Sequence, residues 1–170
     1  ILVADVLPSA GPEIVVADSS SRMLRIYSGA NAPAGPTEVK ALSLQSQPFQ
    51  IDCADLDGDG DSDLVSSDES EIAFAYNTGA GNFQVIPVSV SSAGLLGVAS
   101  LGDVDGNGLL DFAAARSHSV VLGLQLAAGV FTTSLVSGPP SVDASTVALG
   151  NLNGDGLADL LTARVGLFGG

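Results

Sequence analysis

The feature that most restricts how this sequence can fold is a short motif, rich in aspartate and glycine, that recurs at a fixed spacing. Copies occupy residues 55–63, 103–111 and 151–159, so that each copy begins 48 residues after the one before it. A degenerate fourth copy runs from Asp5 to Glu13, fifty residues ahead of the first. A fixed period of about 40–50 residues is typical of a chain built from similar supersecondary units packed one after another.

The same register extends beyond the motif. Gly81 and Phe83 in the second unit correspond to Gly129 and Phe131 in the third. Upstream of each motif, apolar residues fall in two columns, one made of Val3, Cys53, Leu101 and Leu149 and the other of Ile1, Ile51, Ala99 and Val147. Because Cys53 lies in such a column, we expect a buried, small apolar side chain rather than a reactive thiol.

Each unit is predicted to contain four short strands. In the second unit, turn signals separate strand-like segments at 49–54, 63–67, 71–76 and 83–89. No segment has a 3.6-residue apolar period long enough for a helix. Four-stranded units of this length, repeated head to tail, predict an all-β chain that folds as a β-propeller with antiparallel blades. Small side chains in the second strand of a unit, as at residues 113–115, let neighbouring blades approach closely.

The whole chain, residues 1–170, is predicted to be a single domain. Its blades are expected at approximately 1–46, 47–94, 95–142 and 143–170, and the last is incomplete because the sequence ends after a third strand. Three complete blades and a partial fourth fit a fragment of a larger propeller, which we favour, or an incomplete four-bladed ring. The chain opens with Ile rather than Met, and we expect it to be a piece of a longer protein.

The charge of the chain excludes several classes of partner. Nineteen acidic residues against five basic ones give a net charge of −14, which argues against nucleic acid or an anionic membrane. No apolar run approaches the roughly 20 residues of a membrane span, so we do not expect membrane insertion. Ten of the nineteen acidic residues lie within the three motif copies. Such a concentration of like charge indicates a cation that neutralises it.

The loop chemistry favours Ca²⁺, a hard ion that takes about six to eight oxygen ligands. Side chains at motif positions 1, 3, 5 and 9 and the carbonyl at position 7 supply oxygens, and glycines at positions 4 and 6 let the backbone turn tightly. The predicted ligands are Asp55, Asp57, Asp59, the Asp61 carbonyl and Asp63 in the second unit; Asp103, Asp105, Asn107, the Leu109 carbonyl and Asp111 in the third; and Asn151, Asn153, Asp155, the Leu157 carbonyl and Asp159 in the fourth. We expect two to three ions, and none in the Asp5 copy, which has Leu7 and Ser9 at its third and fifth positions.

Two other interpretations fit the motif less well. An EF-hand needs a glutamate at position 12, where the three copies have Ser66, Ala114 and Thr162, and its flanks are helical rather than β-like. Plain Asp/Gly turns without an ion are the second alternative. Three copies in register, each with four side-chain oxygens, favour metal binding over that alternative.

The three loops and the segment Asn77-Thr78-Gly79-Ala80-Gly81-Asn82-Phe83 resemble FG-GAP/VCBS repeats, the calcium-binding propeller blades of integrin α-subunits and of many secreted bacterial proteins. The resemblance covers essentially the whole chain, although the Phe-Gly and Gly-Ala-Pro elements that name the family are poorly kept. It implies a propeller, often seven-bladed, with metal loops on one face and partners on the opposite face. It also implies an extracellular or cell-surface location.

The resemblance does not fix one function, since such repeats occur in adhesion modules, lectin-like modules and accessory domains of enzymes. We interpret the chain as a non-catalytic, calcium-binding module for extracellular binding or adhesion, with a protein or a glycan as its ligand. The alternative is a structural subunit of a polymeric surface fibre or scaffold, in which further copies of the chain pair through open sheet edges. Enzymatic activity is not expected, because nearly all clustered carboxylates are assigned as metal ligands and the single histidine, His118, has no catalytic companions.

Charged residues also occupy the position five residues after each motif copy, namely Asp18, Asp68, Arg116 and Arg164. With acids on two blades and arginines on the next two, they form a candidate partner-binding rim. A solvated turn position is the plainer interpretation of the same residues. Asp52, on a predicted inner strand, is a candidate to line the central channel of a propeller.

Overall fold

The computed structural model describes residues 1–8, 11–29, 32–68, 70–90, 99–116, 119–137 and 146–163. In these ranges all regular secondary structure is β-strand. The first sheet contains β1 (Leu2–Ala4), β2 (Glu13–Asp18), β3 (Met23–Ser28) and β4 (Thr37–Ser43); the second contains β5 (Gln50–Ala54), β6 (Asp63–Ser67), β7 (Glu71–Asn77) and β8 (Phe83–Ser89); the third contains β9 (Ser100–Gly102), β10 (Asp111–Arg116), β11 (Ser119–Ala127) and β12 (Val130–Ser137); and the fourth contains β13 (Thr146–Gly150) and β14 (Asp159–Ala163).

Every sheet is antiparallel, and its strands lie side by side in chain order. The prediction of an all-β chain with antiparallel units is therefore confirmed, and in the described residues three of the four units have four strands and the last has two. In the second unit, β6 and β8 have the predicted bounds, whereas β5 begins one residue later and β7 ends one residue later than expected. The predicted third strand of the last unit, in the segment 165–170, lies outside the described residues, as do Arg164 and His118.

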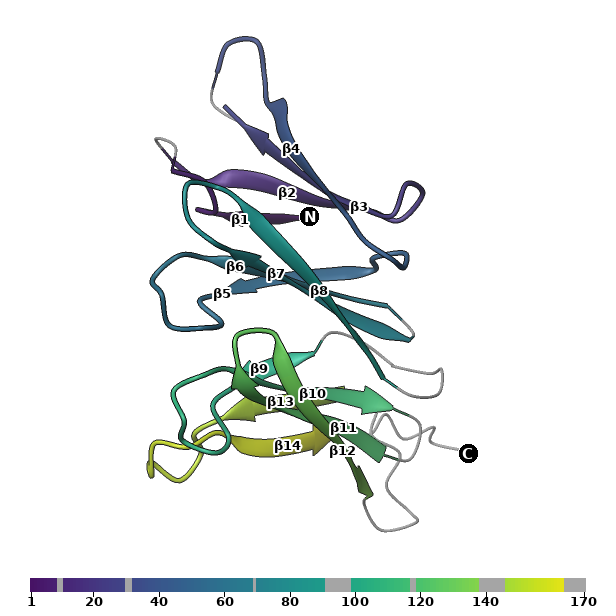
Figure 1. The fold of residues 1–170 in the computed structure, drawn as a ribbon, viewed down its shortest axis with the longest axis vertical. Coiled ribbons are helices and arrows are strands. Elements are labelled where there is room, and N and C mark those ends of the chain that lie inside the picture. Colours follow the sequence, from purple (N-terminus) through teal and green to yellow (C-terminus); the bar gives the residue numbers. More distant parts are fainter. Residues whose placement is uncertain are drawn as a thin grey trace, which may run out of the picture.

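The core lies between consecutive sheets, which follow one another along the molecule (Figure 1). Leu24 and Ile26 of β3 pack with Leu64 of β6 between the first and second sheets. Between the second and third sheets, the rings of Phe74 and Phe131 have centroids 4.5 Å apart, and Phe112 lies 5.6 Å from Phe74 and 5.4 Å from Phe131. Each middle sheet is thus covered on both faces.

Burial on both faces explains why the second and third strands of the middle units are continuously apolar or small rather than alternating. In β10, Ala114 faces the second sheet, whereas Ala113 and Ala115 face the fourth. All of residues 111–115 are buried. The predicted role of small side chains in close sheet packing is therefore confirmed. A larger residue at these positions would push two sheets apart.

The apolar columns before each motif are exposed at their first members and half-buried at the others, apart from Ala99, which is buried. Cys53, Leu101 and Leu149 each pack against the core on the side of the preceding sheet. Val3 in the first sheet is 63% exposed, since no described sheet covers that side. Cys53 is half-buried rather than buried, because β5 is an edge strand of its sheet. Burial, together with the charge of Asp52, still raises the pKa of the Cys53 thiol.

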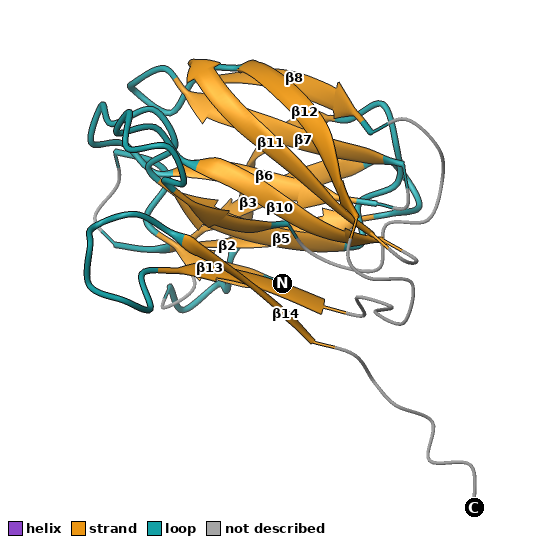
Figure 2. Cartoon of the chain, turned by 90° about the horizontal axis from the view of Figure 1, so that it is seen from below, coloured by secondary structure: helices purple, strands orange, loops and turns teal. Residues whose placement is uncertain are grey.

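The loops divide between the two ends of the strands (Figure 2). The three Asp/Gly loops join the first and second strands of the second, third and fourth sheets, and they project at the left of the molecule in Figure 1. Because the strands are antiparallel, the turns between second and third strands lie at the opposite end. The fold therefore gathers the acidic motif copies at one end, as predicted.

Candidate metal centre

The loop between β5 and β6 is shaped by its first aspartate and its two glycines. Asp55 accepts hydrogen bonds from the backbone N–H groups of Gly58 (2.8 Å) and Gly60 (3.0 Å), one on each carboxylate oxygen. Gly58 and Gly60 have φ values of 78° and 93°, a region that residues with a Cβ rarely adopt. The glycines at motif positions 4 and 6 thus let the chain wrap around the Asp55 side chain.

Asp63 closes the loop as a fully buried carboxylate. Its Oδ2 accepts the N–H of Leu56 (2.8 Å) and its Oδ1 accepts the N–H of Asn77 (2.6 Å). Burial raises the pKa of Asp63 to about 6 against the effect of these two hydrogen bonds, and the charges of Asp57 and Asp59 raise it further. The ionised form of Asp63 is therefore less favourable than it would be in water, and a nearby positive charge would stabilise it.

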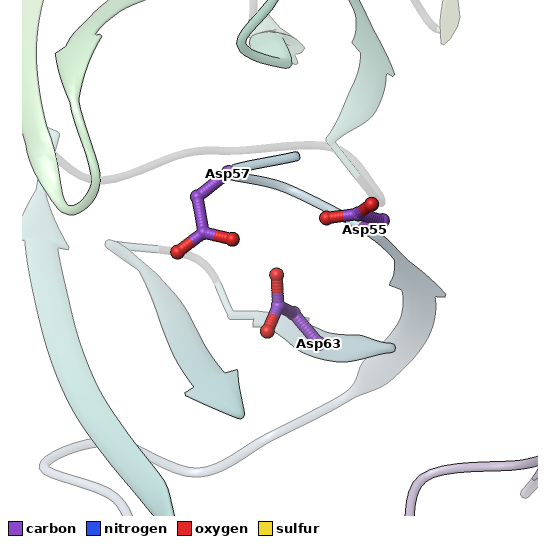
Figure 3. Close-up of side chains that lie close together, drawn as sticks. All are labelled: Asp55, Asp57 and Asp63. Atoms are coloured by element: carbon purple, nitrogen blue, oxygen red, sulfur yellow. The ribbon is translucent and has the colours of Figure 1, made fainter. Parts of the chain in front are cut away.

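Three carboxylates meet inside this loop. Oxygens of Asp55, Asp57 and Asp63 all lie within 4.8 Å of one another, and Figure 3 shows the three groups turned toward a common space. Burial raises the pKa of Asp57, and so do the charges of Asp59 and Asp55. In the described part of the chain, Asp57 Oδ1 is a buried oxygen without a hydrogen-bond partner. Three clustered like charges, one of them fully buried and one with an unpartnered oxygen, fit a hard cation such as Ca²⁺.

The carboxylate at position 5, Asp59, does not join the cluster. Asp59 Oδ1 accepts the N–H of Asp61 (2.8 Å) within the loop, and both residues are exposed. Asp61 was predicted to contribute only its carbonyl. The structure therefore brings together the side chains of positions 1, 3 and 9, while the position 5 carboxylate is bonded to its own backbone.

The loop between β9 and β10 repeats this arrangement. Oxygens of Asp103, Asp105 and Asp111 lie within 4.8 Å of one another. Asp103 accepts the N–H groups of residues 106 (2.7 Å) and 108 (2.9 Å), and the buried Asp111 accepts the N–H groups of residues 104 and 125 (both 2.8 Å). Burial raises the pKa of Asp111. Asn107 uses its side-chain oxygen to accept the N–H of Leu109 (2.8 Å), so position 5 is again bonded locally.

The loop between β13 and β14 keeps the backbone arrangement with fewer charges. Asn151 accepts the N–H of Gly154 (2.7 Å), and Asp159 accepts that of Leu152 (2.9 Å). Asn153 donates to Asp155 (2.9 Å). The N–H of Leu157 and then this amide lower the pKa of the exposed Asp155. Two carboxylates where the second unit has four make this the weakest of the three candidate sites.

The degenerate copy keeps only the closing interaction of the loop. Glu13 is fully buried, and its Oε2 accepts the N–H groups of Val6 and Leu7, both at 3.1 Å. This carboxylate therefore has the structural role of Asp63 and Asp111. Leu7 at the third position supplies no oxygen from its side chain.

Two buried residues that hold the closing carboxylates were not predicted as site residues. The N–H groups that bind Asp63 Oδ1 and Asp111 Oδ1 belong to Asn77 and Gln125, which are 48 residues apart and both buried. An alignment of the units at the repeat spacing would have shown that both positions carry a side-chain amide. Their partners in the neighbouring unit are not encoded in any local pattern.

A protein-family model described as an FG-GAP-like repeat matches residues 55–114 and again residues 103–162. The chain belongs to the FG-GAP-like repeat family. Each match begins at the first aspartate of an acidic loop and runs into the second strand of the next unit. No curated protein sequence matches this chain.

Solved structures share the fold of these FG-GAP-like repeats. A lectin of Agrocybe aegerita, described as recognising non-reducing terminal N-acetylglucosamine, has a TM-score of 0.61 and 23% identity over 93% of this chain and 44% of the lectin. The Tc holotoxin pore of Photorhabdus luminescens has a TM-score of 0.54 and 20% identity over 93% of this chain and 8% of that chain. The chain therefore spans less than half the length of either structure. Together with the family match, these similarities support a β-propeller-like arrangement of the sheets.

At the end opposite the acidic loops, the two aspartates of the candidate rim are engaged in their own turns. Asp18 accepts hydrogen bonds from Ser20 and Ser21 and forms an ion pair with Arg25 (2.8 Å). These bonds hold the pKa of Asp18 well below its usual range. Asp68 accepts the N–H groups of residues 70 (2.7 Å) and 71 (2.8 Å). These contacts favour a turn-stabilising role, while Arg116 lies at the end of β10.

Two hollows lie between the first and second units of the chain. One, of about 330 Å³, is at the end of the acidic loops beside Asp61 and Asn77. The other, of about 350 Å³, is at the opposite end and is lined by Arg22, Gln45, Phe49, Asp68 and Ser70, among others. Phe49 is 58% exposed there, and Arg22 has a φ of 57°, which is uncommon for a residue other than glycine. We call this second hollow the interblade hollow.

In the described part of the chain, no helix is long and apolar enough to cross a membrane. Asp52, the candidate channel residue, is exposed on β5, and its Oδ1 accepts the N–H of Cys53 (2.8 Å).

Proposed function

We propose that this chain is a non-catalytic, calcium-binding module that binds a glycan outside the cell or at its surface. The observation that carries the calcium part is the pair of three-carboxylate clusters, in one of which Asp57 has a buried oxygen without a partner. Membership of the FG-GAP-like repeat family supports the same ion and an extracellular location.

In each loop the ion would be held by the carboxylates at positions 1, 3 and 9. When bound, Ca²⁺ supplies positive charge that cancels the repulsion among them. The chain's own residues supply the frame, because the first carboxylate orders the loop through its glycine N–H groups and the ninth is fixed by two backbone donors. This bonding of the clustered carboxylates also supports a structural rather than a catalytic role.

The interblade hollow is the proposed glycan site. A sugar ring presents a face of C–H groups and a rim of hydroxyl groups, and it therefore fits a hollow with an exposed aromatic ring surrounded by polar side chains. The hollow offers Phe49 as the apolar surface, with Arg22, Gln45 and Asp68 nearby. The shared fold with a lectin supports a glycan over a protein ligand.

Binding to a panel of immobilised glycans tests this proposal. Glycans ending in N-acetylglucosamine are compared with glycans ending in other sugars, using the unsubstituted chain, Phe49→Ala and the control Leu126→Ala. Leu126 is also an exposed large apolar residue, 61% accessible, and it lies on β11. We expect Phe49→Ala to weaken binding at least about tenfold, a loss of about 1.4 kcal/mol, and Leu126→Ala to leave it unchanged. Absence of binding to every glycan, or equal loss in both variants, would contradict the glycan proposal.

A further inference from the structure

Gln125 lies between the acidic loops of the second and third units, with none of its surface exposed. Its Nε2 donates a hydrogen bond of 2.7 Å to the carbonyl of Leu56, a residue of the 55–63 loop. Its Oε1 accepts a hydrogen bond from the hydroxyl of Tyr76 on β7. Both polar atoms of this side chain are therefore bonded to the second unit, although Gln125 itself belongs to the third.

The backbone of Gln125 is bonded to its own loop. Its N–H donates to Asp111 Oδ1 (2.8 Å), and its carbonyl accepts from Asn107 Nδ2 (2.7 Å). Asp111 and Asn107 occupy positions 9 and 5 of the 103–111 motif. An aspartate at position 107 could not donate this second hydrogen bond, which accounts for the asparagine there. One buried residue thus connects two side chains of the 103–111 loop to the backbone of the preceding 55–63 loop.

The same connection exists one interface earlier, so it is a property of the repeat. Asn77 donates its N–H to Asp63 Oδ1 (2.6 Å) and its Nδ2 to the carbonyl of Val6 (3.1 Å) in the degenerate loop. At that interface only one partner loop has a carboxylate cluster. The Gln125 interface is the one that joins two such clusters. A backbone hydrogen bond from Leu110 to the Leu56 carbonyl (3.2 Å) runs beside it.

We propose that Gln125 couples the two calcium sites, so that an ion in the 55–63 loop increases the affinity of the 103–111 loop. This inference rests on the proposed calcium binding. Leu56 lies between two predicted ligands, and an ion that fixes Asp55 and Asp57 also fixes the peptide group between them. The Leu56 carbonyl then holds the Gln125 side chain, whose N–H orients Asp111. The second ion binds a loop that is already partly ordered, which is the physical origin of positive coupling.

The experiment is a double-variant cycle read by site-specific NMR. The amides of Gly58 and Gly60 report calcium in the 55–63 loop, and those of Gly106 and Gly108 report it in the 103–111 loop. Asp57→Asn weakens the first site. In an otherwise unsubstituted chain we expect it to lower the calcium affinity seen at Gly106 and Gly108 by about fivefold or more.

In the Tyr76→Phe/Gln125→Leu background, Asp57→Asn is expected to change the calcium affinity of the 103–111 loop by less than about twofold. Removing the hydroxyl and the amide together leaves the Leu56 carbonyl with its bond from Leu110, so this carbonyl does not lose its only partner. Tyr76→Phe alone is the control, because the bond from Gln125 to Leu56 is kept. It should retain the full coupling.

Equal coupling in the two backgrounds would overturn the role of Gln125, and so would the absence of coupling in the unsubstituted chain. A further measurement does not depend on any Gln125 variant folding. Because coupling between two binding sites is reciprocal, Asp105→Asn should also lower the calcium affinity seen at Gly58 and Gly60. If no loop glycine responds to Ca²⁺ at all, the calcium proposal itself fails, which is a separate result from a loss of coupling.

Discussion

Asp63 and Asp111 end their loops as buried carboxylates that accept a backbone N–H on each oxygen. These bonds favour the ionised form, but burial outweighs them and raises both pKa values. At the residue scale the loops are thus strained electrostatically when no ion is bound.

The first prediction concerns pH in the presence of a chelator. The pKa of Asp63 is raised to about 6 in the folded protein, against an ordinary value of 3.8. The folded state holds the proton more tightly than the unfolded state, so this contribution to stability is complete below about pH 4 and is lost as the pH rises through about 6. Asp111 has a shift of the same sign. We expect the free energy of unfolding to fall by about 1–3 kcal/mol between about pH 4 and pH 7.

Urea denaturation at several pH values measures this change. Asp18 has a pKa shift of the opposite sign, but its effect lies below this window. Saturating Ca²⁺ serves as the control and should remove the decline, since the ion favours the deprotonated carboxylates. Stability of the metal-free protein that rises from about pH 4 to pH 7 would show that burial of Asp63 and Asp111 does not dominate.

The second prediction concerns Asp57→Asn. The substitution removes the charge of the carboxylate whose buried oxygen has no partner. Without calcium, the variant should be more stable than the unsubstituted chain, because the negative charge at position 57 no longer repels the carboxylates of Asp55 and Asp59. With calcium, it should be less stable, because the 55–63 loop loses a charged ligand and at least about tenfold in affinity. Thermal melts in chelator and in Ca²⁺ test this reversal of sign.

Asp52→Asn is the matched control, since Asp52 is exposed on the neighbouring β5 and belongs to neither cluster. It should shift the melting temperature little in either buffer. A variant at position 57 that is destabilised to the same extent with and without calcium would mean that Asp57 has only a structural role.

At the scale of elements, β10 and β11 show how tightly the sheets are packed. Gly123 on β11 is paired with Phe112 on β10, and a Cβ added at Gly123 would lie 2.1 Å from the Phe112 ring. That ring is fully buried against Phe74 and Phe131 and cannot move without displacing them. We expect Gly123→Ala to cost about 1–3 kcal/mol, as overpacked core positions do.

Gly150→Ala is the control for that substitution. Gly150 ends β13, and a Cβ there meets no atom within 4 Å. Its effect should lie within about 0.5 kcal/mol of zero. Urea denaturation of both variants in calcium-containing buffer measures the difference. Equal stabilities would mean that β11 shifts freely relative to β10.

The elements that the sequence predicted well are those with local boundaries. β6 and β8 begin directly after turn-forming segments, and their bounds were predicted to the residue because Asp, Asn and Gly specify turns locally. The clustering of Asp55, Asp57 and Asp63 was also predictable, since a loop of nine residues brings its own side chains together.

The contacts between sheets could not be predicted in the same way. Gln125 and Leu56 are 69 residues apart, and their hydrogen bond depends on how two sheets face each other rather than on any local pattern. The exposure of Val3 has a similar origin. The residue is apolar like its counterparts in the other units, but whether it is buried depends on a neighbouring sheet. Periodicity defines the unit, whereas packing between units decides burial.

On the scale of the whole molecule, stability should depend on whether ions occupy the loops at the acidic end. The sheets contact their neighbours in sequence, so the free energy of folding is approximately a sum over units and interfaces. Ten of the nineteen acidic residues lie in the three loops at one end, and the net charge of −14 would become −8 with three doubly charged ions bound (−14 + 6). Calcium therefore acts on adjacent interfaces at once.

The last prediction is the size and order of the calcium effect. An ion at a hundredfold excess over its Kd stabilises the folded state by about 2.7 kcal/mol per site, so two occupied clusters should raise the melting temperature by about 10–20 °C. Mg²⁺ at the same concentration is the control for charge screening, because the smaller ion prefers octahedral sites with several waters.

The side-chain charge of the predicted ligands falls from −4 in the 55–63 loop to −3 in the 103–111 loop and −2 in the 151–159 loop. We therefore expect a chelator to remove the ion from the 151–159 loop first and from the 55–63 loop last. A chelator titration followed by NMR at the glycine amides of each loop measures this order. An inverted order would show that ligand charge does not set affinity here.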